Sequence, residues 1–235
     1  DVEKISEATW CTADVKNQIN EIGCLLKDLS DNSSAVITSP DNIIKELFSH
    51  QGSGTMIQKT EPIHKYESLE DVDVPRLTQL LTQSFQKPLK SDHMDVVQEH
   101  LQSVYISENY TAAAVVIHDR EKCEIPYLDK FVISSKCQGQ GASDDLWNNL
   151  TQDFPSLFWR SRTTNRINPW YFCRADGSWT NGNWIIFWYG VEELKISQKL
   201  VEFAGNLPDS FDPVAKHDVG MKSENRSTTS YIQYV

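Results

Sequence analysis

The chain has 235 residues, of which 39% are hydrophobic, and it contains seven tryptophans. This composition predicts a folded protein with one large domain, or one domain and part of another, because domains commonly contain about 100–200 residues. The formal charge of −11 at pH 7 argues against a nucleic acid or an anionic membrane as the main partner, since both require concentrated positive charge.

The first expected elements form a small α/β unit. Apolar residues recur at helical spacing over residues 14–29, which predicts a helix with one buried face. Residues 35–38 are β-prone and predict a strand, and a serine–proline pair then predicts a helix over residues 40–48. We expect residues 1–58 to be the end of a larger domain, because so small a unit has few partners to pack against.

A second unit is expected at residues 59–212. The apolar patterns predict, in chain order, helices at 74–85 and 92–101, strands at 103–107, 113–118 and 127–133, a helix at 142–153, strands at 156–162 and 184–189, and a helix at 191–204. This order predicts an α/β fold in which helices flank a central sheet. Residues 213–235 are polar and carry no periodicity, so we expect a disordered tail.

The cysteines and histidines give no sign of a metal centre. The five cysteines are scattered and form no CxxC pair, and they are interpreted as reduced thiols: Cys11, Cys24, Cys123, Cys137 and Cys173. The six histidines are equally dispersed along the chain. We therefore expect no bound metal.

A glycine-rich turn separates the strand predicted at 127–133 from the helix predicted at 142–153. Its exposed backbone amides and the positive end of the following helix suit a pyrophosphate. The sequence QGQGAS at 138–143 resembles the acetyl-CoA loop of GNAT acetyltransferases. An ordinary glycine turn is the alternative. A dinucleotide loop and a nucleotide P-loop are disfavoured, because the downstream acidic residue and the GKS or GKT lysine are both missing.

Two arginines mark the strand predicted at 156–162. Arg160 and Arg162 stand two residues apart, so both guanidinium groups point to one face of a strand. A guanidinium group matches a carboxylate in bidentate geometry, which favours an anionic ligand. The alternative is that both arginines form internal salt bridges with some of the 33 acidic residues.

Longer blocks carry a family resemblance. They are GSGT at 52–55, YLDKFV at 127–132, QGQG at 138–141, LFWRSR at 157–162, INPWYF at 167–172 and LPDSF at 207–211. From about residue 35 to residue 212 the chain resembles the C-terminal part of the animal N-acetylglutamate synthase family. The resemblance implies a GNAT fold, with a mixed and mostly antiparallel sheet flanked by helices, preceded at 1–58 by the remnant of an amino-acid-kinase-like domain.

The same resemblance implies the reaction and its surroundings. It implies acetyl transfer from acetyl-CoA to the α-amino group of L-glutamate, in arginine biosynthesis and the urea cycle, within the mitochondrial matrix. It also implies a homo-oligomer when the whole kinase-like domain is present. The arginine effector site of the family falls mostly or wholly outside residues 1–58, so we expect no arginine regulation of this chain alone.

Residue by residue, the resemblance implies two ligand sites. The glutamate site falls on Lys87, Lys130, Arg160, Arg162, Asn165 and Tyr171. The acetyl-CoA site falls on Phe131, Val132, Gln138, Gly139, Gln140, Gly141, Ala142 and Ser143. Two lysines and two arginines can neutralise both carboxylates of glutamate and fix its amine near the thioester. The chain departs from the family pattern at Cys137, Ser143 and Arg166.

The expected mechanism is direct attack of the neutral amine on acetyl-CoA in a ternary complex. A backbone N–H group in residues 129–132 is expected to hold the oxyanion. Tyr171 is the expected general acid that protonates the departing thiolate, Asp129 or a nearby water takes the proton of the amine, and Asn165 completes the catalytic set.

Two other functions remain possible on the sequence alone. One is a GNAT transferase for a different amino acid or a polyamine, of which the polyamine is disfavoured by the four cations. The other is an inactive regulatory module that keeps the fold. Turnover and the choice of acetyl acceptor distinguish these possibilities.

Overall fold

The computed structural model describes residues 12–29, 33–48, 53–59, 61–135, 137 and 141–213. The chain divides into two compact units, residues 1–60 and 61–235, so the boundary lies two residues after the expected one. Apart from Pro213, the predicted tail lies outside the described residues. Among the helices that are described, none has the length and apolar character needed to cross a membrane.

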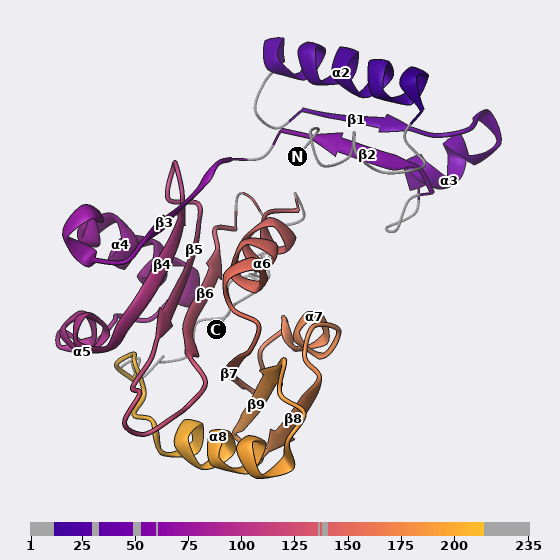
Figure 1. Ribbon diagram of the computed structural model, residues 1–235. Helices are drawn as coiled ribbons and strands as arrows, with labels where there is room; N and C mark the ends of the chain where they lie inside the picture. Colours follow the sequence, from indigo (N-terminus) through magenta and orange to yellow (C-terminus); the bar gives the residue numbers. More distant parts are fainter. Residues whose placement is uncertain are drawn as a thin grey trace, which may run out of the picture. The chain divides into compact units, whose positions relative to one another are not determined.

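The first unit pairs two short strands with two helices (Figure 1). Its elements are α2 (Ala13–Asp28), β1 (Ser34–Ile37), the short 3-10 helix η1 (Pro40–Asn42), α3 (Ile43–Phe48) and β2 (Thr55–Gln58). The Thr12 hydroxyl caps α2 by accepting a hydrogen bond from the Val15 amide at 3.4 Å. Strands β1 and β2 are antiparallel. The predicted helices and first strand are confirmed, whereas β2 was not predicted.

The second unit is built on one seven-stranded sheet. Its elements are β3 (Ile63–Tyr66), η2 (Leu69–Asp71), α4 (Val74–Phe85), α5 (His93–His100), β4 (Leu101–Ser107), β5 (Ala112–Ile117), β6 (Tyr127–Ile133), α6 (Ala142–Asp153), β7 (Leu157–Arg162), α7 (Asn168–Phe172), β8 (Gly177–Thr180), β9 (Trp184–Tyr189) and α8 (Leu194–Asn206). The strand order is β3-β4-β5-β6-β7-β9-β8. Among the described strands of this sheet, only the β6–β7 pair is parallel, so the predicted mixed and mostly antiparallel sheet is confirmed. The sequence did not predict β3, α7 or β8.

Helices cover both faces of this sheet and form two apolar cores. Helices α4, α5 and α8 contribute Leu77, Val97 and Leu200 to one core. Helices α6 and α7 contribute Leu146 and Tyr171 to the other core. Successive side chains along a strand point to opposite faces of the sheet, so neighbouring strand residues contribute to different cores.

Strands β6 and β7 pair at their beginnings and then diverge, as Figure 1 shows. Within these two strands, Tyr127 and Phe158 are Cα partners, and no further partner pair follows. The pairing of β5 with β6 also shifts register, because Val115 faces Lys130 whereas Val116 faces Leu128. Asp129 is thus the extra residue of a β-bulge. The bulge lies beside the diverging strands, where the polar residues gather.

Candidate active site

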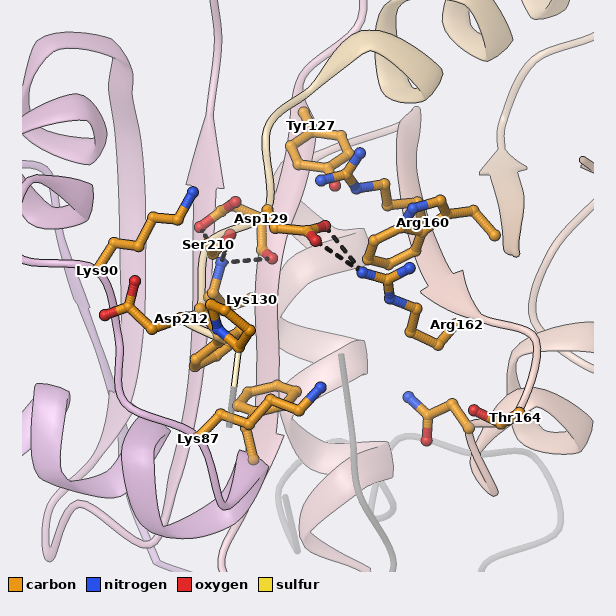
Figure 2. A pocket seen from close by; sticks show the side chains of 16 residues that line it. Lys87, Lys90, Tyr127, Asp129, Lys130, Arg160, Arg162, Thr164, Ser210 and Asp212 are labelled. Atoms are coloured by element: carbon orange, nitrogen blue, oxygen red, sulfur yellow. Dashed lines mark hydrogen bonds and ion pairs between the residues drawn. The ribbon is translucent and has the colours of Figure 1, made fainter. Parts of the chain in front are cut away.

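A pocket of about 420 Å³ lies in the second unit (Figure 2). Its walls come from the α4–α5 connection, β6, β7, the loop after β7, β9 and the segment after α8. The lining residues are Phe85, Lys87, Lys90, Tyr127, Asp129, Lys130, Arg160, Arg162, Thr164, Asn165, Trp184, Asp209, Ser210, Phe211, Asp212 and Pro213. The structure therefore brings together five of the residues assigned to the glutamate site, Lys87, Lys130, Arg160, Arg162 and Asn165, with Asp129, which was assigned a role in proton transfer.

Arg160 is buried and is bound to the backbone after α8. Its Nη1 donates to the carbonyl oxygens of Ala204 at 2.8 Å and Leu207 at 2.7 Å, and its Nη2 donates to Pro208 at 2.6 Å. The side chain is only 4% exposed. Three of its five N–H groups are thus used by the protein itself. These bonds hold the backbone that returns over the pocket. This role differs from the two considered from the sequence, which were binding an anionic ligand and forming internal salt bridges with acidic residues.

Lys130 and Asp129 form a buried ion pair on the bulge. The Lys130 ammonium lies 2.7 Å from Asp129 Oδ2, and it also donates to Ser210 Oγ at 2.9 Å. His93 Nε2 lies 3.0 Å from the same carboxylate oxygen. Burial alone would raise the pKa of Asp129, but Lys130 and His93 together hold it well below its ordinary value. Burial lowers the pKa of Lys130, which Asp129 opposes.

Arg162 is exposed and engages a carboxylate. Its Nη2 donates to both oxygens of Asp209 at 2.9 Å, and the two side chains are 44% and 53% exposed. Figure 2 shows Arg160 and Arg162 on one wall of the pocket. Trp184 lies against both guanidinium groups. Its ring centroid is 4.2 Å from Arg160 Cζ and 3.7 Å from Arg162 Cζ. These cation–π contacts hold the two groups side by side.

Lys87 and Lys90 supply positive charge from the opposite wall. Lys87 is exposed and Lys90 is half-buried. Figure 2 shows the Lys87 side chain extending into the pocket toward the wall that carries Arg162. Within the part of the chain that the structure describes, neither ammonium group has an ion-pair partner. Their charge is available to an anion that enters the pocket.

Tyr171 lies elsewhere in the molecule. It is fully buried in the core under α6, with ring centroids 5.4 Å from Trp159 and 5.5 Å from Phe187. The alternation along β7 explains the separation, because Trp159 points to this core whereas Arg160 points to the pocket. The structure thus does not bring Tyr171 into the pocket with the cations.

The residues assigned to acetyl-CoA lie on β6 and at the start of α6. Phe131 and Val132 are fully buried. Gly141 has a φ of 77°, which favours glycine, and it is the N-cap of α6, whose first residues are Ala142 and Ser143. Gln138, Gly139 and Gln140 lie outside the described residues. In the described ranges, no cluster of His, Cys, Asp or Glu could hold a metal ion.

Several pocket residues were missed by the sequence analysis. Lys90 follows Lys87 by three residues and carried no pattern of its own. Asp209 and Ser210 belong to the LPDSF block at 207–211, which supported the family resemblance but was given no role. Trp184 was predicted only as the first residue of a strand. The LPDSF block was the one signal that could have identified Asp209 and Ser210.

Comparisons with known proteins give the family. The model of the N-acetyltransferase domain of N-acetylglutamate synthase matches residues 64–206, which is more than half of the chain. The mitochondrial N-acetylglutamate synthases of Danio rerio and Homo sapiens are 50% and 43% identical, over 90% of this chain and 40% of each relative. The chain thus spans about two fifths of the length of these relatives.

N-acetylglutamate synthase from Neisseria gonorrhoeae, complexed with coenzyme A and N-acetyl-glutamate, matches with a TM-score of 0.46 and 13% identity, over 82% of this chain and 50% of that chain. On the domain match and the animal relatives, the chain belongs to the N-acetyltransferase domain family of N-acetylglutamate synthase.

Proposed function

We propose that this chain transfers an acetyl group from acetyl-CoA to the α-amino group of L-glutamate. The charge of the pocket carries the proposal. Its lining contains five cations, namely Lys87, Lys90, Lys130, Arg160 and Arg162, and three carboxylates, namely Asp129, Asp209 and Asp212. The formal charge left over is therefore plus two. Glutamate with a neutral amine has a charge of minus two, so this substrate would neutralise the pocket.

The exposed cations are the proposed ligands of the glutamate carboxylates. Lys87 and Arg162 extend from opposite walls, so together they can hold two carboxylates of one molecule. Asn165, which also lines the pocket, supplies an amide to the same substrate. Lys130 and Arg160 contribute charge, while their hydrogen bonds keep the pocket in shape. Fixing the substrate at both ends would leave its amine in one position, which lowers the barrier to attack.

Acetyl-CoA is the proposed donor, bound where β6 and β7 diverge. Beyond Tyr127 the backbone of β6 has no Cα partner on β7, and we place the extended chain of acetyl-CoA along this part of β6. Phe131 and Val132 are on this part of β6, and Gln138–Ser143 is the proposed loop for the pyrophosphate. A backbone N–H group of residues 129–132 is the proposed oxyanion donor.

The proposed reaction is a direct attack without an acyl-enzyme. The neutral amine adds to the thioester carbonyl, the C–S bond breaks, and the CoA thiolate takes a proton. Tyr171 is the proposed donor: it lies outside the glutamate pocket, but its ring centroid is 6.4 Å from that of Phe131, on the part of β6 proposed for acetyl-CoA. The lowered pKa of Asp129 makes its carboxylate a weak base at neutral pH. We therefore assign Asp129 to orient the amine, while water accepts the proton.

The relatives also support a location. The Danio rerio and Homo sapiens proteins are mitochondrial by name, and we propose that this chain works in the mitochondrial matrix. The expected homo-oligomer concerns a longer chain, and the proposal for it rests on family resemblance alone.

An assay of CoA thiol release tests the function. The chain is incubated with acetyl-CoA and, separately, with L-glutamate, L-aspartate, L-glutamine or spermidine, and the product is identified by mass. We expect release with L-glutamate and formation of N-acetylglutamate. Turnover with a different acceptor, and not with glutamate, would show that this acceptor is the substrate. Saturable acetyl-CoA binding without turnover of any acceptor would indicate an inactive module.

A further inference from the structure

The segment after α8 returns across the pocket, and its residues 207–212 are called the strap. Hydrogen bonds hold the backbone of the strap near both of its ends. The carbonyls of Leu207 and Pro208 accept from Arg160, and the Asp212 amide donates to Pro88 at 2.9 Å. Phe211 packs on Phe85 at a centroid distance of 4.7 Å. The strap thus has contacts with the same walls that supply the pocket cations.

Asp209 is the strap residue that forms an ion pair with the exposed cation Arg162. Both of its carboxylate oxygens lie 2.9 Å from Arg162 Nη2. A carboxylate of a bound substrate would contact the same guanidinium group. Both side chains are about half exposed, and exposed ion pairs contribute little to stability. The Asp209–Arg162 pair can therefore exchange for another carboxylate at a small cost.

We propose that Asp209 is an autoinhibitory contact of the strap, which competes with the substrate carboxylate for Arg162. This inference rests on the proposed function of the pocket and adds a requirement to it. An acetyl acceptor that brings a carboxylate can replace Asp209 on Arg162. An acceptor with a neutral group there leaves the internal pair in place, so it gains no contact with Arg162. The strap thus lowers the affinity of the pocket for anionic acceptors, because the Asp209–Arg162 pair must break before such an acceptor contacts Arg162.

Asp212 offers a matched control on the same strap. Its carboxylate also lines the pocket, but it forms no ion pair among the described residues. Asp212→Asn therefore removes the same charge from the same segment without releasing Arg162. A general electrostatic effect would appear equally in Asp209→Asn and Asp212→Asn. Competition for Arg162 would appear in Asp209→Asn alone.

Titration with glutarate, followed by calorimetry, tests the proposal. Glutarate has the two carboxylates of glutamate but no amine, so its binding does not depend on catalysis. We expect Asp209→Asn to lower the Kd for glutarate at least fivefold more than Asp212→Asn does. Equal effects, a raised Kd in Asp209→Asn, or no glutarate binding by wild type and both variants would each overturn the proposal.

The same variants separate this inference from the proposed function. In thiol-release assays, the KM for L-glutamate should fall in Asp209→Asn in parallel with the Kd for glutarate. If no variant turns over glutamate while the Kd difference persists, the proposed function fails and the competition stands. If turnover is normal and the two Kd values agree, only the role of Asp209 fails.

Discussion

The cations of the pocket fall into two groups with different surroundings. The inner cations, Lys130 and Arg160, are 3% and 4% exposed, and protein atoms accept their hydrogen bonds. The outer cations, Lys87, Lys90 and Arg162, are exposed or half-buried, and Arg162 alone among them has an ion-pair partner in the described chain. Equal charge in one pocket thus does not mean an equal role.

The difference follows from the cost of burying charge. A buried cation without partners is strongly destabilising, so an inner cation must be satisfied by the fold before any substrate arrives. An exposed cation is hydrated and can exchange water or a weak partner for a ligand. We therefore expect changes to the inner cations to affect stability first, and changes to the outer cations to affect the KM for glutamate first.

Arg160→Ala should give the largest effect and tests the inner group. Loss of three charge-assisted hydrogen bonds leaves three carbonyls without their donor, and we expect the free energy of unfolding to fall by on the order of 3 kcal/mol. Urea denaturation measures the change, and Arg160→Lys should lie between the variant and wild type. Unchanged stability together with a raised KM for glutamate would place Arg160 in the outer group.

Tyr171→Phe should give the next largest effect. It tests whether a fully buried residue can have a chemical role and not only a structural one. Tyr171 is as buried as the inner cations, yet its proposed role is chemical, so kcat should fall by about 10²-fold with little change in stability. Tyr105→Phe is a matched control, since Tyr105 lies in the same core as Tyr171 but its hydroxyl donates to Asp153. Wild-type kcat in Tyr171→Phe would remove the tyrosine from the mechanism.

The pH dependence of stability tests the Lys130–Asp129 pair. Folding lowers the pKa of Asp129, so its carboxylate stabilises the folded state fully above about pH 4, and this contribution is lost as the pH falls further. The stability of wild type relative to Asp129→Asn should therefore decrease by about 1.4 kcal/mol per pH unit below about pH 4. Denaturation at a series of pH values measures it, and a constant difference would argue against the pair.

Sequence periodicity predicted the long elements but not the short ones. Helix α4 has buried residues at Leu77, Leu80 and Leu81, a spacing that sequence alone reveals. Strands β3 and β8 have four residues each, and α7 has five, so too few positions repeat to define a period. Strand β3 forms because it pairs with β4, and β8 forms because it pairs with β9. In both cases the partner comes later in the sequence, so the short segment itself carries no strand pattern.

The candidate site was predictable where it follows strand alternation. Arg160 and Arg162 were expected on one face, and both line the pocket. Asp129 and Lys130 are consecutive, so alternation would separate them, and only the bulge opposite β5 brings both to the pocket. Asp209 lies 47 residues from Arg162, a distance at which no local pattern indicates contact.

Lys87→Met tests most directly whether the outer cations bind the acetyl acceptor. At saturating acetyl-CoA, we expect the KM for L-glutamate to rise about tenfold, with kcat and the free energy of unfolding little changed, because a charge contact of the bound substrate is lost. Lys199→Met is the control, since this exposed lysine on α8 pairs with Glu124 away from the pocket. A wild-type KM for glutamate in Lys87→Met would contradict the division between inner and outer cations.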